Sequence, residues 1–410
     1  MGLGALVGVP AALLAALFIA VVHELEHWLW HDLPERLDAS GPPWYLVLGL
    51  PLAGACVVLA ARTLLPGDGG HEPLDPITVA PTPIAHAPGI ALAAVGSLAF
   101  GAVLGPEAPL IALGSVVGVA AGRVARLGAA EGKVLSTAGS FSAISALFGG
   151  PLVAGMLLLE AGVGLGAAII PILIPGLVAA AIGYLIFLGL GDWGGLDTTA
   201  LSVPGLPVYD GVHLRDLVIA VGVGVVIAFL VEVVRRLAAR IASPGRARLG
   251  MPVLLLGGGL AVGALALLAD GLGASSQDVL FSGQASIPGL VSEDSTRIIL
   301  VLIAAKALAY AVCLGCGFRG GPVFPAIFLG VAVAMLAVIA FDMSPTLALA
   351  VGTAAGTAAM TRLVFASLLF AGLLVGTAGI DTIPVAALGT VAAWLTMAAI
   401  DARFPVRRTV

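Results

Sequence analysis

Residues 105–109 read Gly-Pro-Glu-Ala-Pro and open the run Pro109-Leu-Ile-Ala-Leu-Gly114, which recurs in altered form as Pro325-Ala-Ile-Phe-Leu-Gly330. The two copies are offset by 216 residues, the difference between 325 and 109. Each copy follows a loop with a Gly-Pro pair. Because proline ends a preceding helix and is favoured in the first turn of a new one, a helix N-terminus is predicted at both places.

A second block of the same repeat lies downstream. Phe148, Leu152, Ala154 and Gly155 match Phe365, Leu369, Ala371 and Gly372 at an offset of 217. Duplicated halves of a membrane protein usually hold their ligand at the repeat interface, near the middle of the bilayer. We expect one transmembrane domain over residues 1–410, with repeat one at roughly 44–190, repeat two at roughly 215–400 and no cytosolic regulatory domain.

The composition excludes an ordinary soluble domain. Of 410 residues, 60% are hydrophobic and 10% are charged, whereas soluble domains carry roughly 25% charged residues. The net charge of −5 is spread without a basic face, which excludes nucleic acid as a partner. The predicted class is an all-α, polytopic integral membrane protein whose surroundings are the lipid bilayer.

Apolar runs give the expected spans. A membrane helix needs about 20 apolar residues, so the chain has room for roughly 10 to 14 full or partial spans. Several runs are short, and broken helices are tolerated in lipid only where they line a cavity or pack inside protein. This pattern favours a transport protein. The runs are 3–22, 44–65, 88–104, 109–122, 134–159, 164–190, 215–234, 251–269, 297–314, 322–341, 345–359, 363–376 and 383–400.

Glu107 is a lone carboxylate between His86 and Arg123 in an otherwise uncharged stretch. Such a residue within a membrane is a functional candidate by default. Helix N-termini carry partial positive charge and free N–H groups, so two of them meeting at mid-membrane would bind an anion. Glu107 would compete for that pocket. The alternative is a first-turn glutamate that complements a helix dipole at the membrane surface.

Three motifs resemble those of the CLC family of chloride channels and proton-coupled chloride transporters. Residues 105–109 are similar to its Gly-Arg/Lys-Glu-Gly-Pro motif, and Gly-Gly-Pro-Val-Phe-Pro at 320–325 is similar to Gly-Gly-Ile-Phe-x-Pro. Phe-Gly-Gly-Pro-Leu-Val-Ala-Gly at 148–155 is similar to Phe-Asn-Ala-Pro-Leu-Ala-Gly. The resemblance covers most of the chain in order, and it implies the inverted-repeat fold of that family, with broken helices meeting at mid-membrane.

The resemblance also implies a site. Glu107 is the gating glutamate, whose side chain plugs the anion path and swings away when protonated. The expected partners are chloride or a similar small anion and a second copy of the chain in a homodimer with one pore per subunit. No enzymatic activity, cofactor or metal is expected. The anion-binding positions are Gly105, Pro106, Ala108, Pro109, Gly321, Pro322, Val323, Phe324, Pro325 and Asp68.

Asp68 departs from the pattern of the family. The Gly-Ser-Gly-Ile-Pro motif falls at Gly67-Asp-Gly-Gly-His71, so Asp68 replaces a serine that donates a hydrogen bond to chloride. An ionised aspartate only accepts hydrogen bonds and would repel a halide. Either Asp68 is protonated and faces the ion, or it turns away. We expect it to turn away, capping the following helix or serving a local turn.

Two further departures concern the binding of the halide and proton coupling. The tyrosine of a last helix is missing, since the final tyrosine is Tyr310. The internal proton-transfer glutamate of the transporters falls near Leu190, with only Asp192 close by. We therefore expect a channel with passive permeation, and the alternative is a proton-coupled chloride antiporter.

A different class of function comes from His23-Glu-Leu-Glu-His27. This segment satisfies the H-E-x-x-H pattern, which places two zinc ligands on one helix face beside a general base. An intramembrane zinc protease would need a further ligand, for which only Asp38, Asp197 and Asp381 are loosely suitable. We interpret residues 23–32 instead as the wet end of the first helix, with Trp28 and Trp30 at the interface.

Other polar residues have structural interpretations. Glu160 is expected to be structural, capping or interfacial, and Lys306 either snorkels to the interface or serves the pore. Arg319 either adds positive potential at a pore entrance or anchors the interface. The basic clusters at 123–133, 235–248 and 403–408 predict cytoplasmic loops and a cytoplasmic C-terminus in a multi-pass protein of the cell membrane.

Overall fold

The computed structural model describes residues 2–39, 41–76, 80–162, 169–194, 203–248 and 250–404. In this part of the chain the regular structure is helical, apart from one isolated bridge between two backbone segments. The chain begins with α1 (Gly2–His27), which continues through a π-helical turn at Trp28–Asp32 into α2 (Leu33–Arg36). α3 (Trp44–Leu64) and α4 (Ala87–Leu98) follow.

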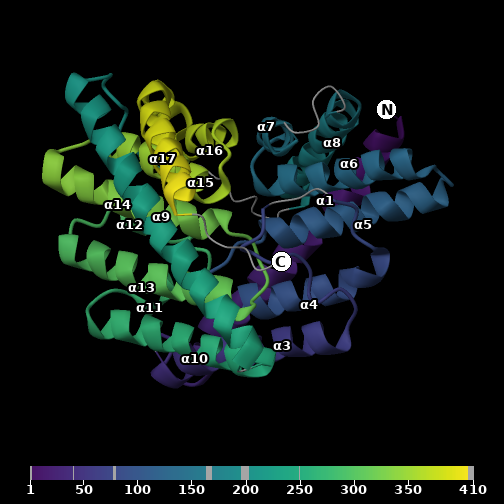
Figure 1. The fold of residues 1–410 in the computed structure, drawn as a ribbon, viewed down its shortest axis with the longest axis horizontal. Coiled ribbons are helices and arrows are strands. Elements are labelled where there is room, and N and C mark those ends of the chain that lie inside the picture. The colour runs from purple at the N-terminus through teal and green to yellow at the C-terminus, as the bar shows by residue number, and fades with distance from the viewer. Residues whose placement is uncertain are drawn as a thin grey trace.

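The repeat appears as two sets of helices in the same order. The first set is α5 (Glu107–Val124), α6 (Ala129–Leu147), α7 (Pro151–Ala161) and α8 (Ile170–Gly194). The second set is α14 (Val323–Phe341), α15 (Pro345–Thr361), α16 (Phe365–Val375) and α17 (Ile383–Arg403). α5 and α14 begin 216 residues apart, as do α6 and α15. The two sets lie on opposite sides of the molecule (Figure 1).

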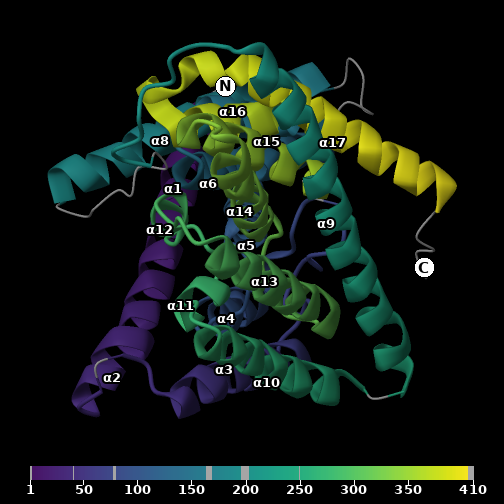
Figure 2. The same ribbon diagram turned by 90° about the vertical axis from the view of Figure 1, so that its left-hand side faces the viewer.

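Five helices connect the two sets. They are α9 (Leu214–Arg248), α10 (Gly250–Gly271), α11 (Ser276–Val279), α12 (Ile287–Val291) and α13 (Thr296–Cys316). α10 packs against α3, and α13 packs against α9, α10 and α14. Figure 2 shows α1 and α9 on opposite flanks, with α5, α13 and α14 between them. Of the helices that carry the repeat motifs, α5 and α14 therefore lie between these two flanks in this view.

Glycines allow the repeat helices to pack backbone against backbone. A Cβ atom on Gly114 of α5 would lie 2.4 Å from the carbonyl oxygen of Gly139 in α6. A Cβ atom on Gly330 of α14 would lie 2.1 Å from the carbonyl oxygen of Gly352 in α15. Such close approach is the usual packing of membrane helices, which have no hydrophobic effect to hold them together. The same kind of contact thus packs α5 closely against α6 and α14 closely against α15.

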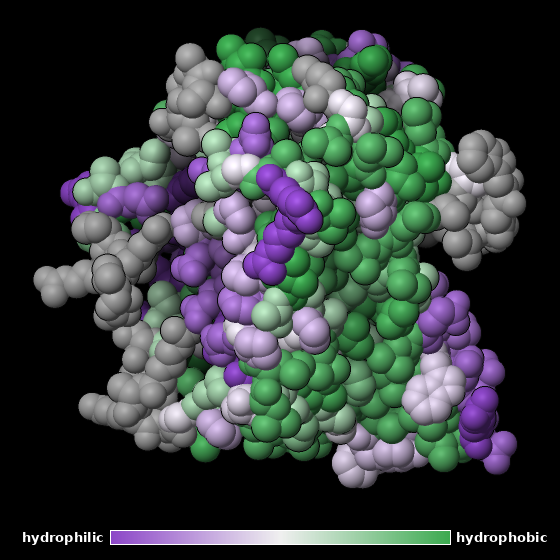
Figure 3. Space-filling model, turned by 90° about the vertical axis from the view of Figure 1, so that its right-hand side faces the viewer, coloured by the Kyte–Doolittle hydropathy of each residue, from purple (hydrophilic) through white to green (hydrophobic). Residues whose placement is uncertain are grey.

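The predicted all-α membrane architecture is confirmed. Nine helices of the described chain are long and apolar enough to cross a membrane, and three shorter apolar helices accompany them. The short ones lie at Ile84–Leu98, Pro151–Ala161 and Phe365–Ala378, so partial spans are part of the fold. Figure 3 shows a broad apolar face with hydrophilic residues gathered at its margins.

Two details differ from expectation. The run at 134–159 is two helices rather than one, because the chain turns at Gly149 and Gly150, which both have positive φ, before Pro151 begins α7. Trp30 does not lie at an interface. It is buried, and its indole Nε1–H donates to the carbonyl of Ala99 at 3.0 Å. Trp28 is exposed.

Candidate functional site

The two repeats meet at a backbone bridge between Gly105 and Gly321. The N–H of Gly105 donates to the carbonyl of Gly321 at 2.7 Å, and the N–H of Gly321 donates back to the carbonyl of Gly105 at 2.6 Å. α5 begins at Glu107 and α14 at Val323, each two residues after its bridge glycine. The N-termini of both helices are therefore held side by side in the interior, where their partial positive charges add.

The side chain of Glu107 crosses from one repeat to the other. Its Oε1 accepts a hydrogen bond of 2.5 Å from the backbone N–H of Val323, which is the first residue of α14. Glu107 is only 1% exposed, and its Oε2 has no hydrogen-bond partner among the described residues. A buried carboxylate on the N–H groups of a helix N-terminus stands where a bound anion would stand.

The bridge glycines leave the space that this carboxylate fills. A Cβ atom on Gly321 would lie 2.0 Å from Cδ of Glu107, and one on Gly105 would lie 2.0 Å from its Oε2. Side chains of any other kind would collide with the carboxylate at both positions. The Gly-Pro pairs thus have two roles in the site. Each proline precedes the start of a helix, and each glycine leaves room for the Glu107 carboxylate.

Aromatic side chains surround the bridge. The ring of Phe324 lies 5.8 Å from that of Phe148, which in turn makes an edge contact at 4.4 Å with Phe370. The hydroxyl of Tyr310 in α13 donates to the carbonyl of Pro322 at 2.7 Å. The sequence does not indicate Tyr310 as a site residue, because α13 lies outside both repeat motifs and nothing in its sequence marks the contact.

The structure brings both predicted anion-binding segments together. Gly105, Ala108 and Pro109 are buried beside Glu107, and Pro106 is the N-cap residue of α5. Pro322 is the N-cap residue of α14, and Gly321 through Pro325 are all buried. Asp68 is in a separate place. It lies on the loop after α3, and its carboxylate accepts a hydrogen bond from Arg319, which lies two residues before Gly321.

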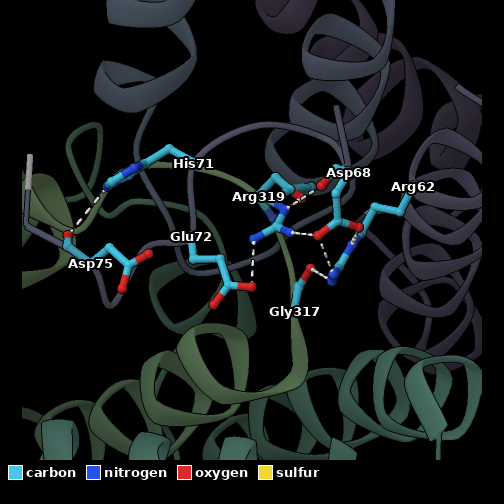
Figure 4. Close-up of polar contacts among 8 residues, drawn as sticks. Arg62, Asp68, His71, Glu72, Asp75, Gly317 and Arg319 are labelled. Carbon is cyan, nitrogen blue, oxygen red and sulfur yellow. Dashed lines mark hydrogen bonds and ion pairs between the residues drawn. The ribbon is translucent and has the colours of Figure 1, made fainter. Parts of the chain in front are cut away.

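Asp68 is held by two arginines (Figure 4). Arg62 donates from Nε to Oδ1 and from Nη2 to Oδ2, both at 2.9 Å. Arg319 donates from Nη2 to Oδ2 at 2.6 Å and from Nε to the Asp68 carbonyl at 3.0 Å. Of the two expected roles, a helix cap and a local turn, the described residues show the turn, because the next described helical turn has Pro83 as its N-cap residue without a side-chain bond. Asp68 lies in a turn, with the N–H of Gly70 bonded to the carbonyl of Gly67.

A cavity of about 230 Å³ joins this loop to α5. Gly67, Gly70 and His71 line it on the loop side, and Ala108 and Ile111 line it on the α5 side. Ala108 directly follows Glu107 in the chain. The Asp68 loop and the first turn of α5 therefore face one open space.

Comparisons with known proteins agree with this geometry. The sequence model of one family, described as voltage gated chloride channel, matches residues 69–397. The chain belongs to this family. The resemblance that the three motifs carried is therefore confirmed, and the family transports ions across membranes.

Relatives and solved structures extend the match over most of the chain. The ion-transport protein YfeO of Escherichia coli (strain SMS-3-5 / SECEC) is 29% identical over 352 residues, which is 80% of this chain and 77% of that protein. YfeO of Shigella boydii serotype 4 is 28% identical over the same length. A slow cyanobacterial Cl−/H+ antiporter has the same fold at a TM-score of 0.78, with 17% identity and 98% and 97% of the two chains covered. A CLC-type fluoride/proton antiporter gives a TM-score of 0.72 and 19% identity over 96% and 93% of the two chains.

Glu160 forms a second link between the halves of this family member. Its Oε1 accepts from the N–H groups of Val364 and Phe365 at 2.8 and 2.9 Å, and its Oε2 accepts from that of Ala366 at 2.7 Å. These N–H groups belong to the start of α16. Glu160 was expected to be structural, capping or interfacial, and the structure shows that it caps α16. The Asp192 side chain lies outside the described residues.

Lys306 neither snorkels to the surface nor pairs with a pore carboxylate in the described chain. Its Nζ is buried and donates to the carbonyls of Asp278, Val279 and Leu280 at 2.8, 3.2 and 3.0 Å. It also lies 4.4 Å from the ring centroid of Phe328. The ammonium group thus closes the C-terminal end of α11.

The protease alternative has no assembled site in the part of the chain that the structure describes. His23, Glu24 and His27 are exposed on α1, and no cluster of three potential metal ligands occurs among the described residues. Asp197 lies outside them. Because the chain belongs to a family of ion transporters, we interpret the H-E-x-x-H pattern as the polar end of α1.

Proposed function

We propose that this protein transports chloride or another small anion along a path through the Gly105–Gly321 bridge, and that Glu107 is the gate of this path. The main support for this proposal is the hydrogen bond from the Val323 N–H to the Glu107 carboxylate at the start of α14. An anion needs the same N–H groups and the same positive helix end. Glu107 and the anion therefore exclude each other.

Opening requires that the carboxylate leave this position or lose its charge. Protonation removes the repulsion between Glu107 and an incoming anion and weakens the bond to Val323, because a charged acceptor binds an N–H group more strongly than a neutral one. Flux is then expected to rise as the pH on the accessible side falls. The anion-binding segments at 105–109 and 321–325 supply backbone N–H groups once Glu107 has moved.

Two modes of transport are compatible with such a gate. Passive permeation is the mode that the sequence favours, because the second carboxylate of a proton path is not evident in it. Proton-coupled exchange is favoured by the two solved structures of similar fold, which are antiporters that move protons against chloride and fluoride. A carboxylic gate can carry a proton, so both modes use the same Glu107.

The two modes separate in one experiment. Purified protein is reconstituted into vesicles loaded with chloride, fluoride or nitrate, and anion efflux is recorded together with the external pH. Efflux without stoichiometric proton movement is expected for passive permeation, and proton movement in fixed ratio to the anion is expected for exchange. Vesicles that release no anion faster than protein-free vesicles would contradict the proposed function.

We also propose a homodimer in the cell membrane with one path per subunit and a cytoplasmic C-terminus. The ends of α9 and α17 support a common side for two of the basic clusters, because Nη2 of Arg236 donates to the carbonyl of Phe404 at 3.1 Å. Basic loops are retained on the cytoplasmic side. Cross-linking in native membranes and labelling of cysteines introduced at these ends test both statements.

A further inference from the structure

The buried guanidinium groups of Arg62 and Arg319 both bind the carboxylate of Asp68. Arg62 lies in the last turn of α3, and Arg319 lies in the loop before α14. Their side chains are 7% and 2% exposed, whereas that of Asp68, which they share, is 55% exposed (Figure 4). The positive groups are thus part of the protein interior, and the negative group sits at their solvent side.

Buried cations of this kind require an anionic partner. An isolated charge removed from water is strongly unfavourable, so the pair is stable only with a hydrogen-bonded counter-charge in place. Asp68 supplies it, and Glu72 adds a second carboxylate 3.8 Å from Nη1 of Arg319. Because Asp68 meets the fork of Arg62 with both oxygens, what the arginines bind is a planar O–C–O group.

Asp68 is attached to the protein by a pliable turn. Gly67, Gly69 and Gly70 all have positive φ, and Asp68 itself has a φ of 49°. The cavity that reaches Ala108 beside Glu107 opens on Gly67 and Gly70. A carboxylate on such a turn can leave the guanidinium pair toward solvent, and the turn itself borders a cavity that is also lined by Ala108, the residue after Glu107.

We propose that Arg62 and Arg319 form an anion-binding site at the entrance to the path, that Asp68 occupies it as a tethered competitor, and that its free ligands are small planar oxyanions such as formate or nitrate. This inference rests on the proposed function for its role in transport, but not for the binding itself. Planar oxyanions match the guanidinium fork with two parallel hydrogen bonds, whereas a spherical halide does not.

The covalent attachment of Asp68 to the chain determines how strongly the two arginines bind a free anion. A tethered group competes at a high effective concentration, so the free anion binds weakly while Asp68 is present. Weak binding suits an entrance, because a transported ion must leave each site as readily as it enters. Removal of the Asp68 carboxylate should therefore convert a weak oxyanion site into a strong one.

Binding is tested by chemical rescue. Asp68→Ala is purified in detergent, and its melting temperature is measured with formate, nitrate or chloride at equal ionic strength. We expect Asp68→Ala to melt below wild type, and formate and nitrate to restore at least about 2 °C more than chloride does. Asp75→Ala is the matched control, because it removes a carboxylate from the same loop that makes no ion pair with either arginine in the described structure. It should show no preference among the anions.

Equal effects of the three anions on Asp68→Ala would overturn the proposal. If this variant does not fold, Arg62→Lys keeps the charge but loses the fork. In reconstituted vesicles its formate-to-chloride flux ratio should fall severalfold below that of wild type, and an unchanged ratio would again overturn the proposal. Wild-type vesicles that move no anion would contradict the proposed function alone, since the melting experiment measures binding without transport.

Discussion

Glu107 and Val323 occupy equivalent positions of the two repeats, 216 residues apart, and the carboxylate of the first is bonded to the backbone N–H of the second. The duplication therefore does more than build two similar halves. It brings the positive end of one copy's helix to the acidic residue of the other, and only the first copy carries that acidic residue. The proposed gate depends on this difference between otherwise matching segments.

The first prediction concerns the space around Glu107. Gly321→Ala puts a methyl group 2.0 Å from Cδ of Glu107, so the carboxylate has to leave the start of α14. Anion flux at neutral pH should rise, and its dependence on pH should weaken. Gly289→Ala is the control, since nothing lies within 4 Å of a Cβ atom there. A folded Gly321→Ala protein with wild-type flux and pH response would show that Glu107 does not block the path from this position.

The second prediction concerns Glu160. Glu160→Ala removes the acceptor for three N–H groups at the start of α16, and loss of such a cap costs about 0.5–2 kcal/mol. The melting temperature should fall, while the pH response of anion flux stays that of wild type because Glu107 is untouched. Glu24→Ala, on the exposed part of α1, should change neither quantity. An altered pH response in Glu160→Ala would assign Glu160 to proton transfer instead of capping.

The third prediction uses the two lysines of the chain. Lys306→Met removes the donor from three carbonyls, of which those of Val279 and Leu280 take part in buried hydrogen bonds, and each buried group left unsatisfied costs about 1–3 kcal/mol. Lys133→Met, at an exposed position of α6, should be nearly neutral. Thermal unfolding of both variants measures the difference. Equal melting temperatures would mean that Lys306 does not hold the end of α11.

The fourth prediction concerns metal. Because His23 and His27 are exposed and no described third ligand joins them, purified protein should carry no stoichiometric zinc, and chelators should leave anion flux unchanged. Elemental analysis before and after treatment with a chelator measures this. Zinc that is retained by wild type and lost in His23→Ala would restore the protease alternative.

Much of the fold could be predicted from local signals. The Gly-Pro pairs and the runs that begin at Pro109 and Pro325 predict the starts of α5 and α14. Helix-breaking residues and apolar periodicity are local signals, which can be recognised within one segment of sequence. For the same reason Glu107 could be assigned to a helix N-terminus without knowledge of its partner. The bond to Val323 follows only when the two segments are folded together.

Contacts between distant segments could not be predicted. Asp68 and Arg319 are separated by 251 residues, and nothing in the sequence near either one indicates the other. The glycines around Asp68 indicated the local turn that is found there, but they gave no sign of the two buried guanidinium groups that bind its carboxylate. Trp30 was assigned to the interface because tryptophans favour it, whereas tertiary packing buries this ring against the carbonyl of Ala99.

The most direct test of the account is anion flux through Glu107→Gln in reconstituted vesicles across a range of pH, with wild type and Glu131→Gln measured beside it. Glu131 is an exposed first-turn glutamate of α6 and controls for a mere effect on a helix dipole. Glutamine removes the charge that repels an anion, and one unit charge at about 4 Å is worth roughly 4 kcal/mol at an effective dielectric of 20, so flux at neutral pH should rise at least about tenfold. The rise with falling pH should disappear in Glu107→Gln and persist in Glu131→Gln. Wild-type flux and wild-type pH response in a folded Glu107→Gln protein would contradict the account.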